Sequence, residues 1–258
     1  GDIAVAMLFL SIIQVFIEAP KEKVFTFIAA MFGITAIVLS NSRGSWLSLL
    51  ILSIVYIGLI YKPFLQNNNK GKLFLMLLFS VLIGFIATQA NVNKRIALAD
   101  TEIQSWQSGE NHNDSVGLRL QMWKAGLQAA TQSPWFGYGY RNANKVASEY
   151  APSNKGTIGR KTHLHNEYLT TMVSAGVIGL LALLALLFAP MVIFYRKLKD
   201  KKTYYYASMG ILLCAGYATF GFTHIAFGEE HINAFYVFFM SFLFLNIGRK
   251  NSPLNQTR

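Results

Sequence analysis

The sequence predicts an all-helical, polytopic membrane protein with one long, partly helical polar loop. Hydrophobic residues make up 53% of the 258 residues and charged residues only 14%, whereas about a quarter of the residues in a soluble domain are charged. The charges gather between long apolar segments. Most of these segments approach the length of about 20 residues that crosses roughly 30 Å of hydrocarbon.

Seven apolar segments are predicted to be transmembrane helices, and a long polar stretch separates the fourth from the fifth. We therefore predict four N-terminal spans within residues 1–89, a loop at 90–166, and three C-terminal spans with a tail at 167–258. The first segment is short and begins at Gly1 without a methionine, so we expect further residues before it. The segments comprise residues 3–17, 24–40, 45–61, 73–89, 167–195, 204–222 and 232–247.

The basic residues of the short connections predict the orientation in the membrane. Leaving the long loop aside, alternate connections and the C-terminal tail contain every lysine and arginine except Arg43, and basic short loops face the cytoplasm. The other short connections contain Arg43 alone, or Glu229 and Glu230 without a basic residue. The long loop is then outside the cytoplasm and the C-terminus inside. We attribute the net charge of +11 to these loops rather than to nucleic-acid binding. The basic set is Lys21, Lys23, Lys62, Lys70, Lys72, Arg196, Lys197, Lys199, Lys201, Lys202, Arg249, Lys250 and Arg258.

The long loop contains a predicted helix. Asp114 or Ser115 is a suitable N-cap, and the helix should end near Gln132 because the residue before Pro134 avoids helical geometry. The aromatic, turn-prone residues 135–140 suit the membrane interface. We expect a flexible polar stretch at 142–162, after which His163-Leu164-His165-Asn166 leads into the fifth span.

Three arginines are candidates for binding an anionic group at the outer surface. Arg43 lies in a short outer connection, Arg95 follows the fourth span, and Arg119 lies in the first turns of the loop helix. Guanidinium groups match phosphate and diphosphate in a planar, bidentate manner. The alternative is that each arginine anchors lipid headgroups or pairs with an acidic residue such as Asp100, Glu102 or Asp114.

His165 is the candidate general base. Asn166 can cap the helix of the fifth span, which places His165 beside the positive helix end and favours a neutral imidazole. Neutral imidazole can accept a proton from a hydroxyl. Gly176 and Gly179 should allow close packing of a neighbouring segment. The alternative for His165 is simple solvation at the interface.

Other groups that often perform chemistry are less informative here. His163-x-His165 lacks nearby carboxylates and cysteines that would complete a metal site. His224 and His231 flank the last outer loop with Glu229 and Glu230, where they either line the same cavity or are solvated. Cys214 is interpreted as a small buried hydrophobic residue. An enzyme of this kind would need an activated substrate and neither cofactor nor metal.

Three segments resemble the bacterial O-antigen ligase family, a superfamily that includes O-antigen polymerases and protein O-oligosaccharyltransferases. They are Ser40-Asn41-Ser42-Arg43-Gly44-Ser45-Trp46-Leu47, Gly117-Leu118-Arg119-Leu120-Gln121-Met122-Trp123, and His163-Leu164-His165-Asn166-Glu167 with Gly176 and Gly179. The resemblance extends from about Asn41 to Tyr195. Its most specific element is His165-Asn166 followed, nine residues later, by Gly-x-x-Gly.

This resemblance implies an inverting, metal-independent glycosyltransferase of the bacterial inner membrane. It would transfer a polysaccharide from undecaprenyl diphosphate to the lipid A–core at the periplasmic face. By position, Arg43 and Arg119, and less securely Arg95, would bind the diphosphate, and His165 would be the base. The loop helix and the aromatic run would form a lid. Family members generally have more spans than this chain.

Several alternatives remain at this stage. An O-antigen polymerase or a protein O-oligosaccharyltransferase would use the same chemistry with a different acceptor. A transporter is less favoured, because transporters place ionisable groups within their spans and these spans are almost free of them. A membrane scaffold without enzymatic activity is the remaining possibility.

Overall fold

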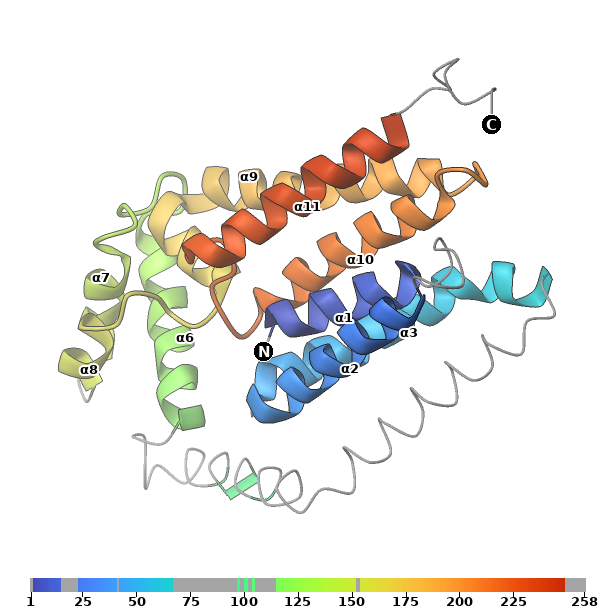
Figure 1. The fold of residues 1–258 in the computed structure, drawn as a ribbon. Helices are drawn as coiled ribbons and strands as arrows, with labels where there is room; N and C mark the ends of the chain where they lie inside the picture. The colour runs from blue at the N-terminus through green and yellow to red at the C-terminus, as the bar shows by residue number, and fades with distance from the viewer. Residues whose placement is uncertain are drawn as a thin grey trace. The chain divides into compact units, whose positions relative to one another are not determined.

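The structure is a computed structural model that describes residues 2–14, 23–40, 42–66, 97, 100, 101, 104, 115–151 and 154–248. The elements in this part of the chain are helices, and it includes no strand. The helices belong to two compact units (Figure 1). Residues 1–59 and 182–258 form the first unit, and residues 60–181 form the second.

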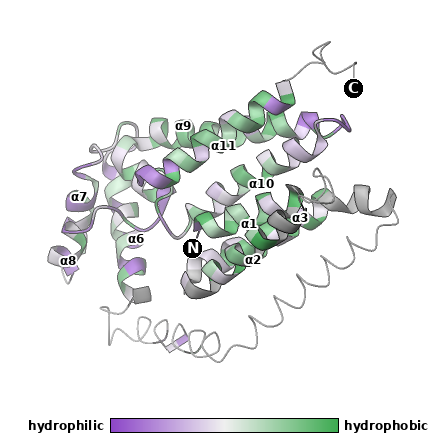
Figure 2. Cartoon of the chain, viewed as in Figure 1, coloured by the Kyte–Doolittle hydropathy of each residue, from purple (hydrophilic) through white to green (hydrophobic). Residues whose placement is uncertain are grey.

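The first unit consists of apolar helices. Helix α1 packs against α2 and α10, and α10 also packs against α11. Figure 2 shows hydrophobic residues along most of α1, α2 and α10. The unit contains α1 (Asp2–Gln14), α2 (Lys23–Ser40), most of α3 (Arg43–Gln66), the second part of α9 (Glu167–Lys197), α10 (Tyr204–Phe220) and α11 (Glu230–Gly248).

Small residues let the helices of the first unit approach closely. A Cβ atom on Gly33 of α2 would lie 3.3 Å from Cβ of Leu8 on α1. The ring of Phe194 on α9 occupies the place where Gly210 of α10 would carry a side chain. Such contacts favour association in lipid, where helix packing depends on close van der Waals contact.

The second unit is built around one buried helix face. It contains α6 (Ser115–Gln132), α7 (Ala143–Glu149), α8 (Lys155–Gly159) and the first part of α9. Helix α7 packs against both α6 and α8, and both short helices carry many hydrophilic residues (Figure 2). The buried core comprises Met122, Ala129, Ala130, Ala143, Ala147, Ile158, Leu164 and Val173.

The expectation of a flexible stretch at 142–162 is wrong for most of its length. Helices α7 and α8 occupy part of it, and Ala143, Ala147 and Ile158 are fully buried. These apolar residues belong to the same buried core as Met122 and Ala129 of α6. Their burial stabilises helices in a segment whose local sequence is polar.

The helices agree with most of the predicted segments. Six of the seven predicted spans contain a helix, and the remaining one, 73–89, lies outside the described residues. Within the described residues, two helices are long and apolar enough to cross a membrane, α9 and α11. Seven spans and a loop outside the cytoplasm therefore stay predictions, whereas the all-helical fold with membrane-type helices is confirmed.

Candidate functional site

Helix α9 is interrupted at Gly176, where a turn of the chain inserts into it. Gly176 has φ 64° and ψ −161°, which is not helical. In an unbroken helix the amide of Val177 would donate to the carbonyl of Val173. Here Val177 N donates to Pro134 O at 2.7 Å, and Val173 O accepts from Tyr138 N at 2.9 Å. The turn therefore supplies a hydrogen-bond partner for each of the two groups, Val177 N and Val173 O, that would bond to each other in an unbroken helix.

Two glycines with positive φ make this insertion possible. Gly137 has φ 63°, as Gly176 has φ 64°, and left-handed backbone strongly favours glycine. A Cβ atom on Gly176 would collide with the carbonyl of Trp135, and one on Gly137 would collide with the backbone of Ser174. The expected close approach at Gly176 thus exists, and its neighbour is the backbone of a turn. The nearest atoms around Gly179 belong to its own helix, at Ala175 and Thr171.

The segment 163–166 is attached to the second unit at Leu164. The Leu164 side chain is fully buried, and its carbonyl accepts a hydrogen bond from the indole Nε1 of Trp123 at 3.0 Å. Its amide donates to Oγ1 of Thr170 at 3.2 Å. Leu164 is therefore held by its side chain, its carbonyl and its amide.

Asn166 caps the N-terminus of α9, as its place in the sequence predicts. Its Oδ1 accepts a hydrogen bond from Leu169 N at 2.9 Å, and its carbonyl accepts from Thr170 N at 2.9 Å. Such a cap satisfies amides that have no partner within the helix. The helix begins at Glu167, so His165 lies beside its positive end.

His165 is held in a conformation that is rare for its residue type. Its φ is 52°, in the left-handed region where most residues with a Cβ are strained by roughly 1–2 kcal/mol. Its imidazole meets that of His163 edge to face, with ring centroids 4.5 Å apart. Nδ1 of His163 lies 2.9 Å from Oγ1 of Thr162. Strain of this kind often accompanies a functional position.

Arg119 lies on the helix that holds the histidine segment. Trp123 follows Arg119 by four positions in α6, and residues at this spacing are neighbours on one helix face, with Cβ atoms about 5–6 Å apart. Since Trp123 donates to Leu164 O, Arg119 begins one turn away from the segment that contains His165. The Arg119 side chain is partly exposed.

A pocket of about 410 Å³ opens beside this arrangement. Its lining is mostly apolar and includes the polar residues Lys124 and Asn166. Lys124 is the charged residue among those that line it, so the pocket combines an apolar wall with one positive charge. Its lining residues are Leu120, Trp123, Lys124, Leu127, Asn166 and Leu169.

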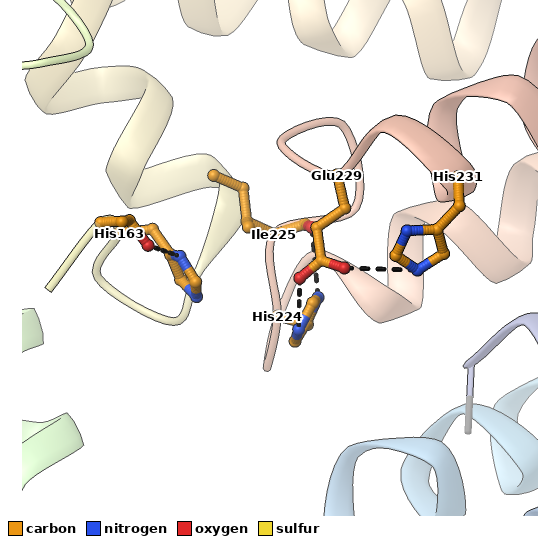
Figure 3. Close-up of polar contacts among 6 residues, drawn as sticks. His163, His224, Ile225, Glu229 and His231 are labelled. Atoms are coloured by element: carbon orange, nitrogen blue, oxygen red, sulfur yellow. Dashed lines mark hydrogen bonds and ion pairs between the residues drawn. The ribbon is translucent and has the colours of Figure 1, made fainter.

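The first unit contains a second polar cluster in the connection between α10 and α11. The carboxylate of Glu229 lies between two imidazoles (Figure 3). Its Oε1 is 3.5 Å from Nε2 of His224 and its Oε2 is 3.4 Å from Nε2 of His231. Nδ1 of His224 is 3.1 Å from the carbonyl of Ile225. The two histidines and Glu229 therefore form one cluster.

The same connection packs against the start of α3. Thr223 fills the space beside Gly44, where a Cβ atom would collide with its hydroxyl. Oγ of Ser45 donates to Oδ1 of Asp2 at 2.7 Å. Arg43 is the first residue of α3, so its backbone lies next to a position that contacts the α10–α11 connection. The predicted connection around Arg43 is thus shorter than expected.

A model of the O-antigen ligase family matches residues 28–184 of this chain, which is more than half of its length. The chain belongs to the O-antigen ligase family. The match includes the start of α3, the whole of α6 and the capped start of α9. Members are membrane proteins of glycosyltransferase type, which agrees with the apolar helices described above.

One relative shares much of the sequence. An uncharacterized protein of Haemophilus influenzae is 31% identical over 209 residues, which cover 77% of this chain and 51% of that protein. The chain therefore spans about half the length of this relative.

Of the four predicted site residues, the structure describes the side chains of His165 and Arg119 but not those of Arg43 and Arg95. His165 and Arg119 lie in the same unit, joined through Trp123 and Leu164. Arg43 belongs to the other unit and its backbone begins α3, but its side chain is outside the described part. Arg95 also lies outside the described residues. Among the residues that are described, no group of three or more His, Cys, Asp or Glu could hold a metal ion.

Sequence reasoning placed Trp123 one turn from Arg119 but gave it no role, and it did not identify Lys124 or the break in α9 as parts of the site. Trp123 stands one turn from Arg119, which was a usable signal, but its partner Leu164 is 41 residues away. Lys124 reaches the site only because Asn166 and Leu169 fold against α6.

Proposed function

We propose that this member of the O-antigen ligase family transfers a polysaccharide from undecaprenyl diphosphate to a hydroxyl of the lipid A–core. The transfer takes place at the periplasmic face of the inner membrane, inverts the anomeric configuration and needs no metal ion. The observation that best supports the proposal is the setting of His165, which has φ 52° beside the capped start of α9. The residue before it, Leu164, is hydrogen-bonded to Trp123, one helical turn from Arg119.

In the proposed reaction His165 acts as general base. Its imidazole accepts the proton of the acceptor hydroxyl while that oxygen attacks the anomeric carbon of the donor sugar. The position beside the positive end of α9 favours neutral imidazole, which is the form that accepts a proton. General-base catalysis typically contributes 10²- to 10⁴-fold to a rate.

The arginines act on the leaving group. As the new glycosidic bond forms, the bond from the anomeric carbon to the diphosphate oxygen breaks, and its electron pair stays on the diphosphate. Arg119, together with Arg43 and Arg95, neutralises the growing negative charge. Positive groups fixed in advance stabilise such charge without further rearrangement, so the donor needs no metal ion to leave.

The pocket beside Asn166 fits a substrate that has an apolar chain joined to a negatively charged group. Its leucines and Trp123 can cover part of a lipid chain, and Lys124 adds a positive charge at its edge. The donor named above has these two properties, with an isoprenoid chain attached directly to a diphosphate. We place the part of the donor nearest to the diphosphate in this pocket.

The test is transfer by the purified full-length protein, in the presence of EDTA, from an undecaprenyl-diphosphate glycan to lipid A–core. We expect His165→Asn and Arg119→Ala each to lower kcat/KM by about 10²-fold or more. Asn is chosen at 165 because it tolerates positive φ, so the backbone is kept. Arg160→Ala is the matched control, since Arg160 is an exposed arginine of the same unit.

Wild-type kcat/KM in His165→Asn would refute the general base, and loss of activity in EDTA that one divalent ion restores would refute the metal-free reaction. Two further acceptors distinguish the related activities. Glycan that appears on another lipid-linked glycan would indicate a polymerase, and glycan on serine or threonine of a protein would indicate a protein O-oligosaccharyltransferase.

A further inference from the structure

The indole of Trp123 makes one directed contact with the histidine segment. Its Nε1 donates a hydrogen bond of 3.0 Å to the carbonyl of Leu164, the residue before His165. This contact joins the middle of α6 to the chain just before α9. The Leu164 carbonyl and the His165 nitrogen belong to one planar peptide group, so holding this oxygen also fixes the plane from which His165 begins.

Further contacts hold the amide and the side chain of Leu164. Leu164 N donates to Oγ1 of Thr170, which donates to the carbonyl of Asn166 at 2.7 Å. The missing side chain at Gly126 admits Leu164, because a Cβ atom there would lie only 2.7 Å from Leu164 Cδ1. Gly126 and Trp123 are three positions apart on α6, so one helix face receives both the side chain and the carbonyl.

The backbone of His165 is consequently held between two residues that are each hydrogen-bonded to a helix. Leu164 is held on one side and Asn166, the cap of α9, on the other. Only a backbone restrained at both ends keeps a histidine at φ 52°, because an unrestrained histidine would leave the left-handed region. The direction of the imidazole then depends on the Trp123–Leu164 hydrogen bond.

We propose that Trp123 is the positioning residue for His165, acting through the carbonyl of Leu164. This inference rests on the proposed function in that His165 is the base. The indole N–H keeps the peptide before His165 in place, and Trp123 is also among the residues that line the pocket beside Asn166. A variant that loses the N–H and keeps the bicyclic shape separates the two roles.

The experiment replaces the N–H and leaves an aromatic ring. Trp123→Phe, and the full-length protein with 3-benzothienylalanine at position 123, both lack the donor, and the second keeps the bicyclic shape. We expect both to lower kcat by about 10- to 100-fold, since a small misplacement of a reacting group has effects of this size. In the benzothienylalanine protein KM for the lipid-linked donor should change by less than about twofold, because its bicyclic ring keeps the shape of the pocket wall.

Two further readouts separate positioning from general loss of structure. Release of His165 from the positive end of α9 removes an effect that disfavours imidazolium, so the acid limb of the kcat/KM profile should move to higher pH. The imidazole resonances of His165, assigned by comparison with His165→Asn, should shift in the same variants. A purely structural role for Trp123 would move neither.

Gln121→Met is the matched control. Gln121 also lies on α6 and accepts a hydrogen bond from Nδ2 of Asn154 on the segment before α8, at 2.7 Å. Its loss removes one tertiary hydrogen bond from the same helix without touching the histidine segment. We expect wild-type kcat, pH profile and His165 resonances in this variant.

The outcomes distinguish the two proposals. If His165→Asn is inactive while both Trp123 variants keep wild-type kcat and unchanged His165 resonances, the positioning role is overturned and the base is upheld. If His165→Asn is fully active, the proposed function fails, although the His165 resonances would still respond to Trp123→Phe. Equal losses in Gln121→Met and Trp123→Phe would also overturn the positioning role.

Discussion

At the scale of single residues, the geometry around Arg119 and His165 is the most informative part of the molecule. Trp123, one helical turn from Arg119, donates a hydrogen bond to the carbonyl of Leu164, which lies 41 positions later in the chain. The next residue is His165, whose φ is 52°. The proposed roles differ, because an imidazole exchanges a proton and a guanidinium does not. The shape of the guanidinium group should therefore matter as well as its charge.

Arg119→Lys tests that point. Lysine keeps the charge but lacks the planar fork that binds two phosphate oxygens together. We expect kcat/KM to fall about tenfold, which corresponds to about 1.4 kcal/mol, the order of one charge-assisted hydrogen bond. The fall in Arg119→Ala should be larger. Equal activities of Arg119→Lys and the wild type in the transfer assay would show that charge alone is sufficient.

At the scale of elements, the broken helix α9 and the turn within it determine how the second unit is held together. Three backbone hydrogen bonds join the two segments, from Tyr138 to Val173, Gly139 to Ser174 and Val177 to Pro134. The turn also positions α7, because Asn142 and Ala143 donate their amides to the carbonyl of Gly139. A side chain at the break should therefore disturb more than one residue.

Gly176→Ala should lower the free energy of unfolding by about 3 kcal/mol or more. A backbone with φ 64° and ψ −161° is adopted almost only by glycine and costs another residue about 1–3 kcal/mol, and displacement of the turn adds the loss of hydrogen bonds worth about 1 kcal/mol each. Gly139→Ala is the control. Gly139 has φ 82° with no neighbouring atom within 4 Å of an added Cβ, so only the backbone strain applies. Equal thermal unfolding midpoints for the two variants in detergent would contradict the inserted turn.

The elements also show how far sequence reasoning reaches. The end of α6 could be predicted because Pro134 disfavours helical geometry in the residue before it. The cap at Asn166 could be predicted because a capping side chain bonds to amides in the first turn of its own helix. Helices α7 and α8 could not be predicted in this way, since α7 packs against α6 and α8 packs against α7. The break at Gly176 could not be predicted from local sequence either, because the turn that bonds to it lies about 40 positions earlier in the chain.

At the scale of the whole molecule, the distribution of charge should fix the orientation in the membrane. The connection between α9 and α10 contains Lys199, Lys201 and Lys202, and basic short loops remain in the cytoplasm. The predicted loop at 90–166 then lies outside the cytoplasm, where a lipid-linked glycan and the lipid A–core would meet. The proposed site requires this orientation.

Cysteine labelling tests the orientation. Lys161→Cys in the second unit and Lys201→Cys between α9 and α10 both replace exposed residues, and Cys214→Ala removes the free, buried native thiol. A membrane-impermeant maleimide added after permeabilisation of the outer membrane alone should label position 161 only. Labelling of position 201 under the same conditions, with position 161 protected, would reverse the predicted topology.

The central claim is that the His165 imidazole takes the proton of the acceptor, and chemical rescue tests it most directly. Glycine accepts the positive φ of this position, so His165→Gly keeps the backbone and leaves space for a free imidazole. We expect transfer by His165→Gly to fall by about 10²-fold or more and to rise with added imidazole, whereas Arg119→Ala does not respond. Full transfer by His165→Gly without imidazole would contradict the account.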